Sequence, residues 1–90
     1  MSKKSCQKTT VYGHRNQPEL SETESRKILT YVREQLEASG YNPVRQIAGY
    51  LQTGDPGYIT ARGGARVEIT KVDRYEVLAW AVENFINSES

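Results

Sequence analysis

The side chains best suited to nucleophilic or metal chemistry are a single cysteine and a single histidine, Cys6 and His14. Both lie in the first 18 residues, a segment too poor in apolar side chains to offset its ordering entropy. A nucleophile and its base need a fixed mutual geometry. A structural zinc site needs about four ligands, mostly Cys and His. The sequence therefore predicts no catalytic dyad, no bound metal and no cofactor.

A second candidate for chemistry is Thr53-Gly-Asp-Pro-Gly57, which superficially resembles a phosphate-binding loop. It lacks the Gly-Lys-Ser/Thr that opens the next helix in a P-loop, and Pro56 removes one N–H donor. The carboxylates of Asp55, Asp73 and Glu76 all fall at positions that suit helix capping. Glu68 is a further carboxylate, but nothing in the sequence argues for a raised pKa at any of the four, so general acid–base catalysis is not supported and we expect a protein without enzyme activity.

Hydroxyl groups are the third candidate, because the first ten residues include Ser2, Ser5, Thr9 and Thr10. Residues 1–18 carry four basic side chains and no acidic one, so the remaining chain carries eight basic and 11 acidic side chains. A phosphate would add negative charge to a basic background. A solvated tail and a tail that a kinase modifies are both consistent with this composition.

Length and composition predict one soluble domain behind this arm. With 90 residues the chain suits one domain with a marginal core. One cysteine allows no internal disulfide, as in a reducing compartment. No apolar run approaches the roughly 20 residues of a membrane helix, and the basic start lacks the apolar stretch of a secretory signal. We expect a cytoplasmic protein without membrane insertion, with a flexible basic arm over 1–18 and a helical domain over 19–90.

The elements that would position these groups are helices with clear ends. Ser21 and Glu24 form a capping-box pattern, which predicts a helix over 22–39 that Gly40 closes. Its apolar stripe is Ile28, Leu29, Val32 and Leu36.

A second helix begins at the next cap-and-proline pair, Asn42 and Pro43, and ends at Thr53-Gly54. Its apolar stripe is Val44, Ile47, Ala48 and Leu51. Gly49 lowers helix propensity, so it either permits the close approach of a neighbour or is simply tolerated. By the same logic Asp55-Pro56 starts a further helical turn that places Tyr58 and Ile59 inward.

Residues 58–72 allow two interpretations. Tyr58 to Ala61 and Arg66 to Val72 read as short strands around a Gly-Gly turn. Read as a helix, Ala65, Ile69 and Val72 share one face.

The hairpin interpretation leads to a winged helix-turn-helix that binds DNA. Arg62 and Arg66 would lie on the wing, and Arg45 on the second helix. The excess of acidic residues after residue 18 disfavours nucleic-acid binding, because attraction to phosphates dominates DNA affinity.

The last helix begins at Asp73, which forms a capping-box pattern with Glu76. Its apolar residues cover more than one face: Tyr75, Val77, Leu78, Trp80, Ala81, Val82, Phe85 and Ile86. A helix with so wide an apolar arc usually has two partners. In a domain this small we expect the second partner to be another subunit, and hence a homodimer.

The stretch from Gly40 to Ile59 resembles one small bacterial family, the IreB regulatory phosphoproteins. Members share a Gly-Tyr-Asn-Pro, then a Gln-Ile-x-Gly-Tyr, then a Gly-Asp-Pro-x-Tyr-Ile at this spacing. The matching positions are Gly40, Tyr41, Asn42, Pro43, Gln46, Ile47, Gly49, Tyr50, Gly54, Asp55, Pro56, Tyr58 and Ile59. The likeness spans roughly residues 24–86 and favours helix after residue 65.

The resemblance implies a fold and a role. The fold is all-α, a compact bundle of three main helices with short helical turns. The role is that of a cytoplasmic substrate of a PASTA-type Ser/Thr kinase and its phosphatase. Such proteins are homodimers that negatively regulate the cell-envelope stress response and cephalosporin resistance through an unknown downstream protein. The family's N-terminal Thr-Val pair matches Thr10-Val11, with Thr9 adjacent. Lys8 and Thr9 stand where members tend to have acidic residues.

Overall fold

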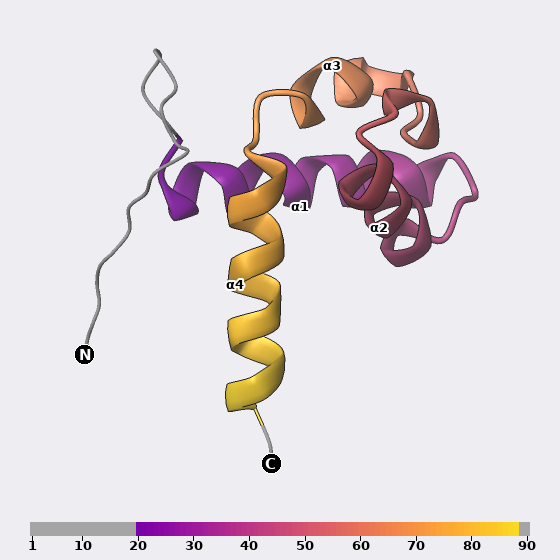
Figure 1. Cartoon of the computed structure of the whole chain (residues 1–90). Coiled ribbons are helices and arrows are strands. Elements are labelled where there is room, and N and C mark those ends of the chain that lie inside the picture. Colours follow the sequence, from indigo (N-terminus) through magenta and orange to yellow (C-terminus); the bar gives the residue numbers. More distant parts are fainter. Residues whose placement is uncertain (1–19, 89–90) are drawn as a thin grey trace.

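The computed structural model describes residues 20–88, and every regular element among them is helical (Figure 1). The main helices are α1 (Glu22–Ala38), α2 (Pro43–Thr53), α3 (Ala65–Ile69) and α4 (Arg74–Asn87), with two 3-10 turns, η3 (Pro56–Tyr58) and η4 (Arg62–Gly64). The predicted all-α fold is confirmed.

The ends of α1 follow from its local sequence. The Ser21 hydroxyl accepts from the Glu24 N–H at 3.1 Å, and the Glu24 carboxylate accepts from the Ser21 N–H at 3.1 Å. At the other end Gly40 adopts a left-handed φ of 86°. There the N–H groups of Tyr41 and Gly40 donate to the carbonyls of Leu36 and Glu37. The predicted start and stop of this helix are confirmed.

The start of α2 and the turn after it also match the prediction. The Asn42 side chain accepts from the Arg45 N–H at 3.2 Å, and Pro43 occupies the first turn. The Asp55 side chain accepts from the Gly57 N–H at 2.8 Å and begins η3. Ile59 is fully buried as expected, but Tyr58 remains 39% exposed, so only one of the two points inward.

The hairpin interpretation of residues 58–72 is wrong, because this segment forms η4 and α3. Gly63 and Gly64 adopt left-handed φ values of 61° and 75° and lead into α3 instead of linking two strands. The Tyr31 hydroxyl on α1 donates to the Gly63 carbonyl at 2.6 Å, which ties the turn to that helix. As the helical interpretation requires, Ala65, Ile69 and Val72 are buried together.

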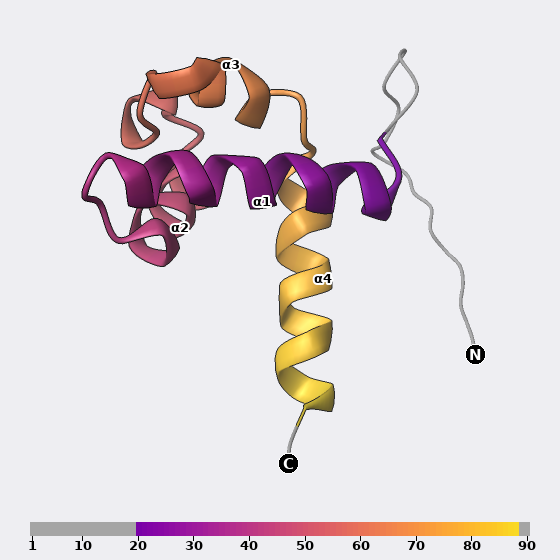
Figure 2. The same ribbon diagram turned by 180° about the vertical axis from the view of Figure 1, so that it is seen from behind.

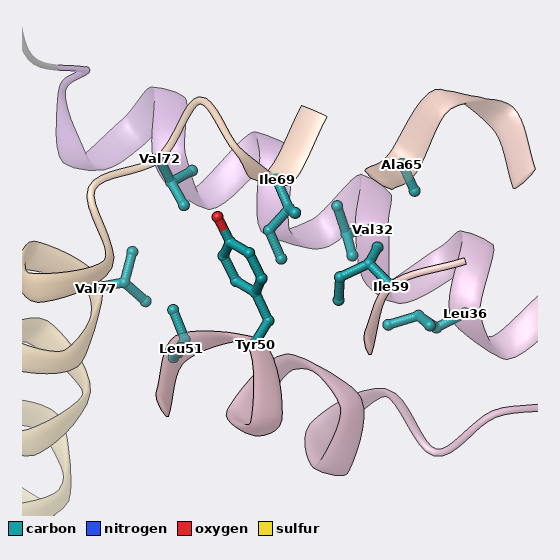
Figure 3. Packing of buried hydrophobic residues seen from close by; sticks show 9 residues of the cluster. All are labelled: Val32, Leu36, Tyr50, Leu51, Ile59, Ala65, Ile69, Val72 and Val77. Carbon is teal, nitrogen blue, oxygen red and sulfur yellow. The ribbon is translucent and has the colours of Figure 1, made fainter. Parts of the chain in front are cut away.

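The core lies where α1, α2 and α3 meet (Figure 3). Val32 and Leu36 enter it from α1, Ile69 from α3, and Ile59 from the segment between the two 3-10 turns. The full buried set is Val32, Leu36, Tyr50, Leu51, Ile59, Ala65, Ile69, Val72 and Val77. The helices α1, α2 and α3 therefore enclose one small cluster of buried apolar residues.

α4 is arranged differently from the other helices. Its first turn joins the core through Val77, and the rest extends away from the body in both views (Figures 1 and 2). Most of its length therefore has neighbours on one side only.

Candidate interaction surfaces

The most exposed apolar surface of the described residues is one face of α4, here called the open face. Its members are Leu78, Val82, Phe85 and Ile86. Phe85 is 84% exposed and Ile86 is 70% exposed. Their spacing of 4, 3 and 1 puts them on one side of the helix. Single exposed apolar residues need no explanation, but a contiguous set like this is typical of interaction sites and makes the open face a candidate.

The opposite side of α4 faces the body. Val77 is buried at 7% exposure and Trp80 is partly buried against the core. Both line a groove of about 450 Å³ between α4, α1 and α2. One apolar side of α4 therefore packs against the body, and the other side is exposed to solvent.

The predicted stripe of α2 also faces this groove more than the core. Leu51 is buried, but Val44 is 75% exposed and lines the groove together with Ile47 and Ala48. Tyr50, which lies outside the stripe, is buried at 5% exposure instead. Because α2 turns Tyr50 toward the core, most of its apolar stripe is left on the groove.

The residues of the central motif mostly hold the backbone. The Gln46 amide donates to the Tyr58 carbonyl at 2.9 Å, which links α2 to η3. A Cβ on Gly49 would lie 2.5 Å from the Tyr58 ring, so this glycine permits a close approach. The neighbour that approaches Gly49 is therefore a tyrosine ring.

Gly54 and Arg74 connect the end of α2 to α4. The Arg74 guanidinium donates to the Leu51 carbonyl at 3.1 Å. A Cβ on Gly54 would lie 2.9 Å from the same guanidinium, and Gly54 has a left-handed φ of 78°. The motif thus explains turns and contacts in the fold, and none of these contacts assembles a reacting group.

The arginines that the DNA-binding alternative invoked lie on three different elements. Arg45 is exposed on α2, while Arg62 begins η4 and Arg66 lies on α3. The Arg66 Nε donates to the Ile59 carbonyl at 2.7 Å, so it fastens α3 to the preceding segment. Without a hairpin, no wing carries Arg62 and Arg66, and that part of the alternative is wrong.

The predicted phosphoacceptors, Thr10 and Thr9, lie outside the described residues, as do Cys6 and His14. Between residues 20 and 88, no three His, Cys, Asp or Glu side chains gather as metal ligands. No helix in that range combines the length and apolarity needed to cross a bilayer.

Sequence reasoning missed two cations on the groove, Arg26 and Arg33 of α1. They lie seven residues apart with Leu29 between them, so two helical turns place all three on one side. That spacing is visible in the sequence. What the sequence does not show is that α2 and α4 enclose this side of α1.

The fold and these surfaces define a small all-α domain without an assembled reacting group among its described residues, in which the motif residues maintain the backbone and the open face and groove remain accessible. Residues 7–87 match the family model described as the IreB regulatory phosphoprotein, and the chain belongs to this family. The resemblance inferred from the central motif is confirmed.

Proposed function

We propose that this protein is a non-enzymatic regulator that a Ser/Thr protein kinase modifies on Thr10. The carrying observation is the family match over residues 7–87, because it includes the Thr10-Val11 pair as well as the helical domain. The family is one of regulatory phosphoproteins, and threonine hydroxyls are the groups that such kinases modify.

The modification is an ordinary phosphoryl transfer. The Thr10 Oγ1 attacks the γ-phosphorus of ATP, its proton passes to the kinase base, and ADP leaves. The partner phosphatase removes the phosphate by hydrolysis. All of this chemistry takes place in the two enzymes, so the protein itself needs no catalytic group.

The cellular role follows from the family resemblance. We propose a cytoplasmic substrate of a PASTA-type kinase that negatively regulates the cell-envelope stress response, including cephalosporin resistance. The basic arm would present Thr10, and the helical domain would bind a downstream protein. The phosphate would add about −1.5 to −2 charge at neutral pH to a segment that carries four basic residues and no acidic one.

We further propose that two copies associate through the open face of α4. Fully burying a side chain such as Phe or Ile stabilises a contact by about 1.5–3 kcal/mol. Phe85 and Ile86 are 84% and 70% exposed in one copy, so a twofold contact could bury both from each subunit.

Phosphate mapping tests the modification. The purified protein is incubated with a PASTA-type kinase and ATP, and sites are mapped by mass spectrometry. We expect Thr10→Ala to lose most of the phosphate and Thr9→Ala, the matched control, to keep it. An arm that stays unmodified in every such pairing would contradict the proposal.

A further inference from the structure

The groove between α1, α2 and α4 combines an apolar floor with a cationic rim. Leu29, Ile47 and Trp80 line it from the three helices, and Arg26 and Arg33 flank Leu29 on α1. A groove of about 450 Å³ falls within the range of sites that take a short segment or a small ligand.

The two rim arginines differ in what they already bind. The Arg26 guanidinium pairs with the Glu22 carboxylate at 2.8 Å, in a contact whose side chains are 67% and 49% exposed. Such exposed pairs contribute little to stability and exchange readily. Arg33 makes no ion pair with any residue between 20 and 88. The rim therefore has one cation available and a second that is weakly held.

We propose that phosphothreonine at position 10 binds this groove of its own chain. The phosphate contacts Arg33 and Arg26, and Val11 and Tyr12 cover the floor at Leu29, Ile47 and Trp80. This inference rests on the proposed phosphorylation of Thr10 and adds where the phosphate goes. Arginine suits this role because its guanidinium donates two parallel hydrogen bonds to phosphate oxygens.

The length of the arm permits this contact. Leu20 follows Thr10 by ten positions, and an extended chain over ten residue steps spans at most about 33–36 Å. The groove begins at Glu22, two residues after Leu20, and Arg33 lies about 16 Å further along α1. The arm can therefore turn back and still reach both arginines.

Charge makes the contact depend on phosphate. The unmodified arm carries four basic residues and no acidic one, so cations on the rim repel it. A phosphate adds a charge of about −1.5 to −2, so position 10, which meets the rim, becomes negative. The next two residues are Val11 and Tyr12, the only adjacent pair in residues 1–18 that are both apolar or aromatic. Phosphorylation would thus cover an apolar groove that the unmodified protein leaves open to a partner.

The test uses the full chain with phosphothreonine installed at position 10 by genetic encoding or chemical synthesis. Trp80 is the chain's single tryptophan and lines the groove, so its fluorescence reports directly on occupancy. We expect the phosphorylated chain to show a blue-shifted Trp80 emission that returns toward the unmodified value as salt is raised. Amide NMR shifts should change at Leu29 and Ile47 in parallel.

Variants locate the phosphate. Arg33→Gln should abolish the emission shift, whereas Arg45→Gln, an exposed arginine of α2 outside the groove, should preserve it. Circular dichroism on both variants confirms that the helices are intact. An emission unchanged by phosphate, or a shift that survives Arg33→Gln in a folded protein, would overturn the proposal.

One further outcome is also decisive. A shift that grows with protein concentration would assign the arm to a second copy and overturn binding within one chain. Because the phosphothreonine is installed without a kinase, a negative result here leaves the kinase-substrate proposal standing. A negative kinase assay likewise leaves this contact testable.

Discussion

Apolar side chains are buried in the segment from α2 to α3, but they are exposed on the outer part of α4. Ile59 and Ile69 are fully buried between helices, whereas Ile86 and Phe85 are 70% and 84% exposed. The α4 sequence has a clear helical periodicity, whereas residues 58–72 allowed both a strand and a helix. Periodicity therefore identifies an apolar face, while the surrounding elements decide whether that face becomes core or contact surface.

Polar residues show the same contrast. In the α2–η3 region Asn42, Gln46 and Asp55 each accept or donate a hydrogen bond that fixes the backbone. Beyond its first turn, α4 carries Glu83 and Asn84, which are exposed. We therefore expect substitutions in the first region to change folding and those on the second to change association.

The largest effect is expected from a core truncation. Leu36→Ala removes a fully buried side chain of α1 and should lower the free energy of unfolding by about 2–5 kcal/mol. Urea titration followed by circular dichroism measures this change. A loss below about 1 kcal/mol would mean that this region is not the enclosed core described above.

Gly49→Ala tests the close approach within the motif. The new Cβ would meet the Tyr58 ring at 2.5 Å, so we expect a loss of about 1–3 kcal/mol from crowding. In a Tyr58→Ala background the same substitution should instead stabilise, by up to about 1 kcal/mol, because alanine is the better helix former. Measuring the unfolding free energy in both backgrounds shows whether the effect of Gly49→Ala changes sign. The same sign in both backgrounds would contradict the steric explanation.

Gln46→Ala removes the hydrogen bond between α2 and the Tyr58 carbonyl. We expect a loss of about 0.5–1.5 kcal/mol in chemical denaturation, the usual range for one hydrogen bond, because this exposed bond is the link between α2 and η3. Gln52→Ala, at an exposed position of the same helix, is the control and should change stability by less than about 0.5 kcal/mol. Equal losses in the two variants would remove the assigned role of Gln46.

The smallest effect on the single protomer is expected at Phe85. Because this side chain is 84% exposed, Phe85→Ser should change the unfolding free energy of dilute protein by less than about 0.5 kcal/mol. Thermal melts over a range of protein concentrations then test whether the side chain contributes to association. The melting temperature of the parent protein should rise with protein concentration, because association stabilises the folded state by mass action. The melting temperature of the variant should not change with concentration. A large loss in dilute protein would place Phe85 in the protomer's own core.

The helix ends could be predicted because local chemistry decides them. Ser21, Asn42 and Asp73 each cap a helix through contacts within three residues, and Gly40 closes α1 within its own turn. The choice between strand and helix at residues 58–72 was not local. It depends on α1, which binds the Gly63 carbonyl through Tyr31 and buries α3.

The surfaces were less predictable for the same reason. The wide apolar arc of α4 was visible, but the face that the body would take was not. The groove with Arg26 and Arg33 needs three helices from distant parts of the chain, so no local pattern marks it as a site. Composition marked Thr10 only as one of several hydroxyls in a basic arm, and the family pattern alone singles it out as the expected phosphoacceptor.

The proposed dimer joins two copies of the chain through the open face of α4. Sedimentation analysis of the parent protein, Phe85→Lys and Val67→Lys tests it most directly. Val67 is a matched control, a 64% exposed apolar residue of α3 away from the open face. We predict a dimer for the parent and for Val67→Lys. For Phe85→Lys we predict a folded monomer, with dimer affinity about 30-fold or more weaker, as for a hot spot of about 2 kcal/mol. A monomeric parent at high concentration, or a dimer that Phe85→Lys leaves intact, would contradict the account.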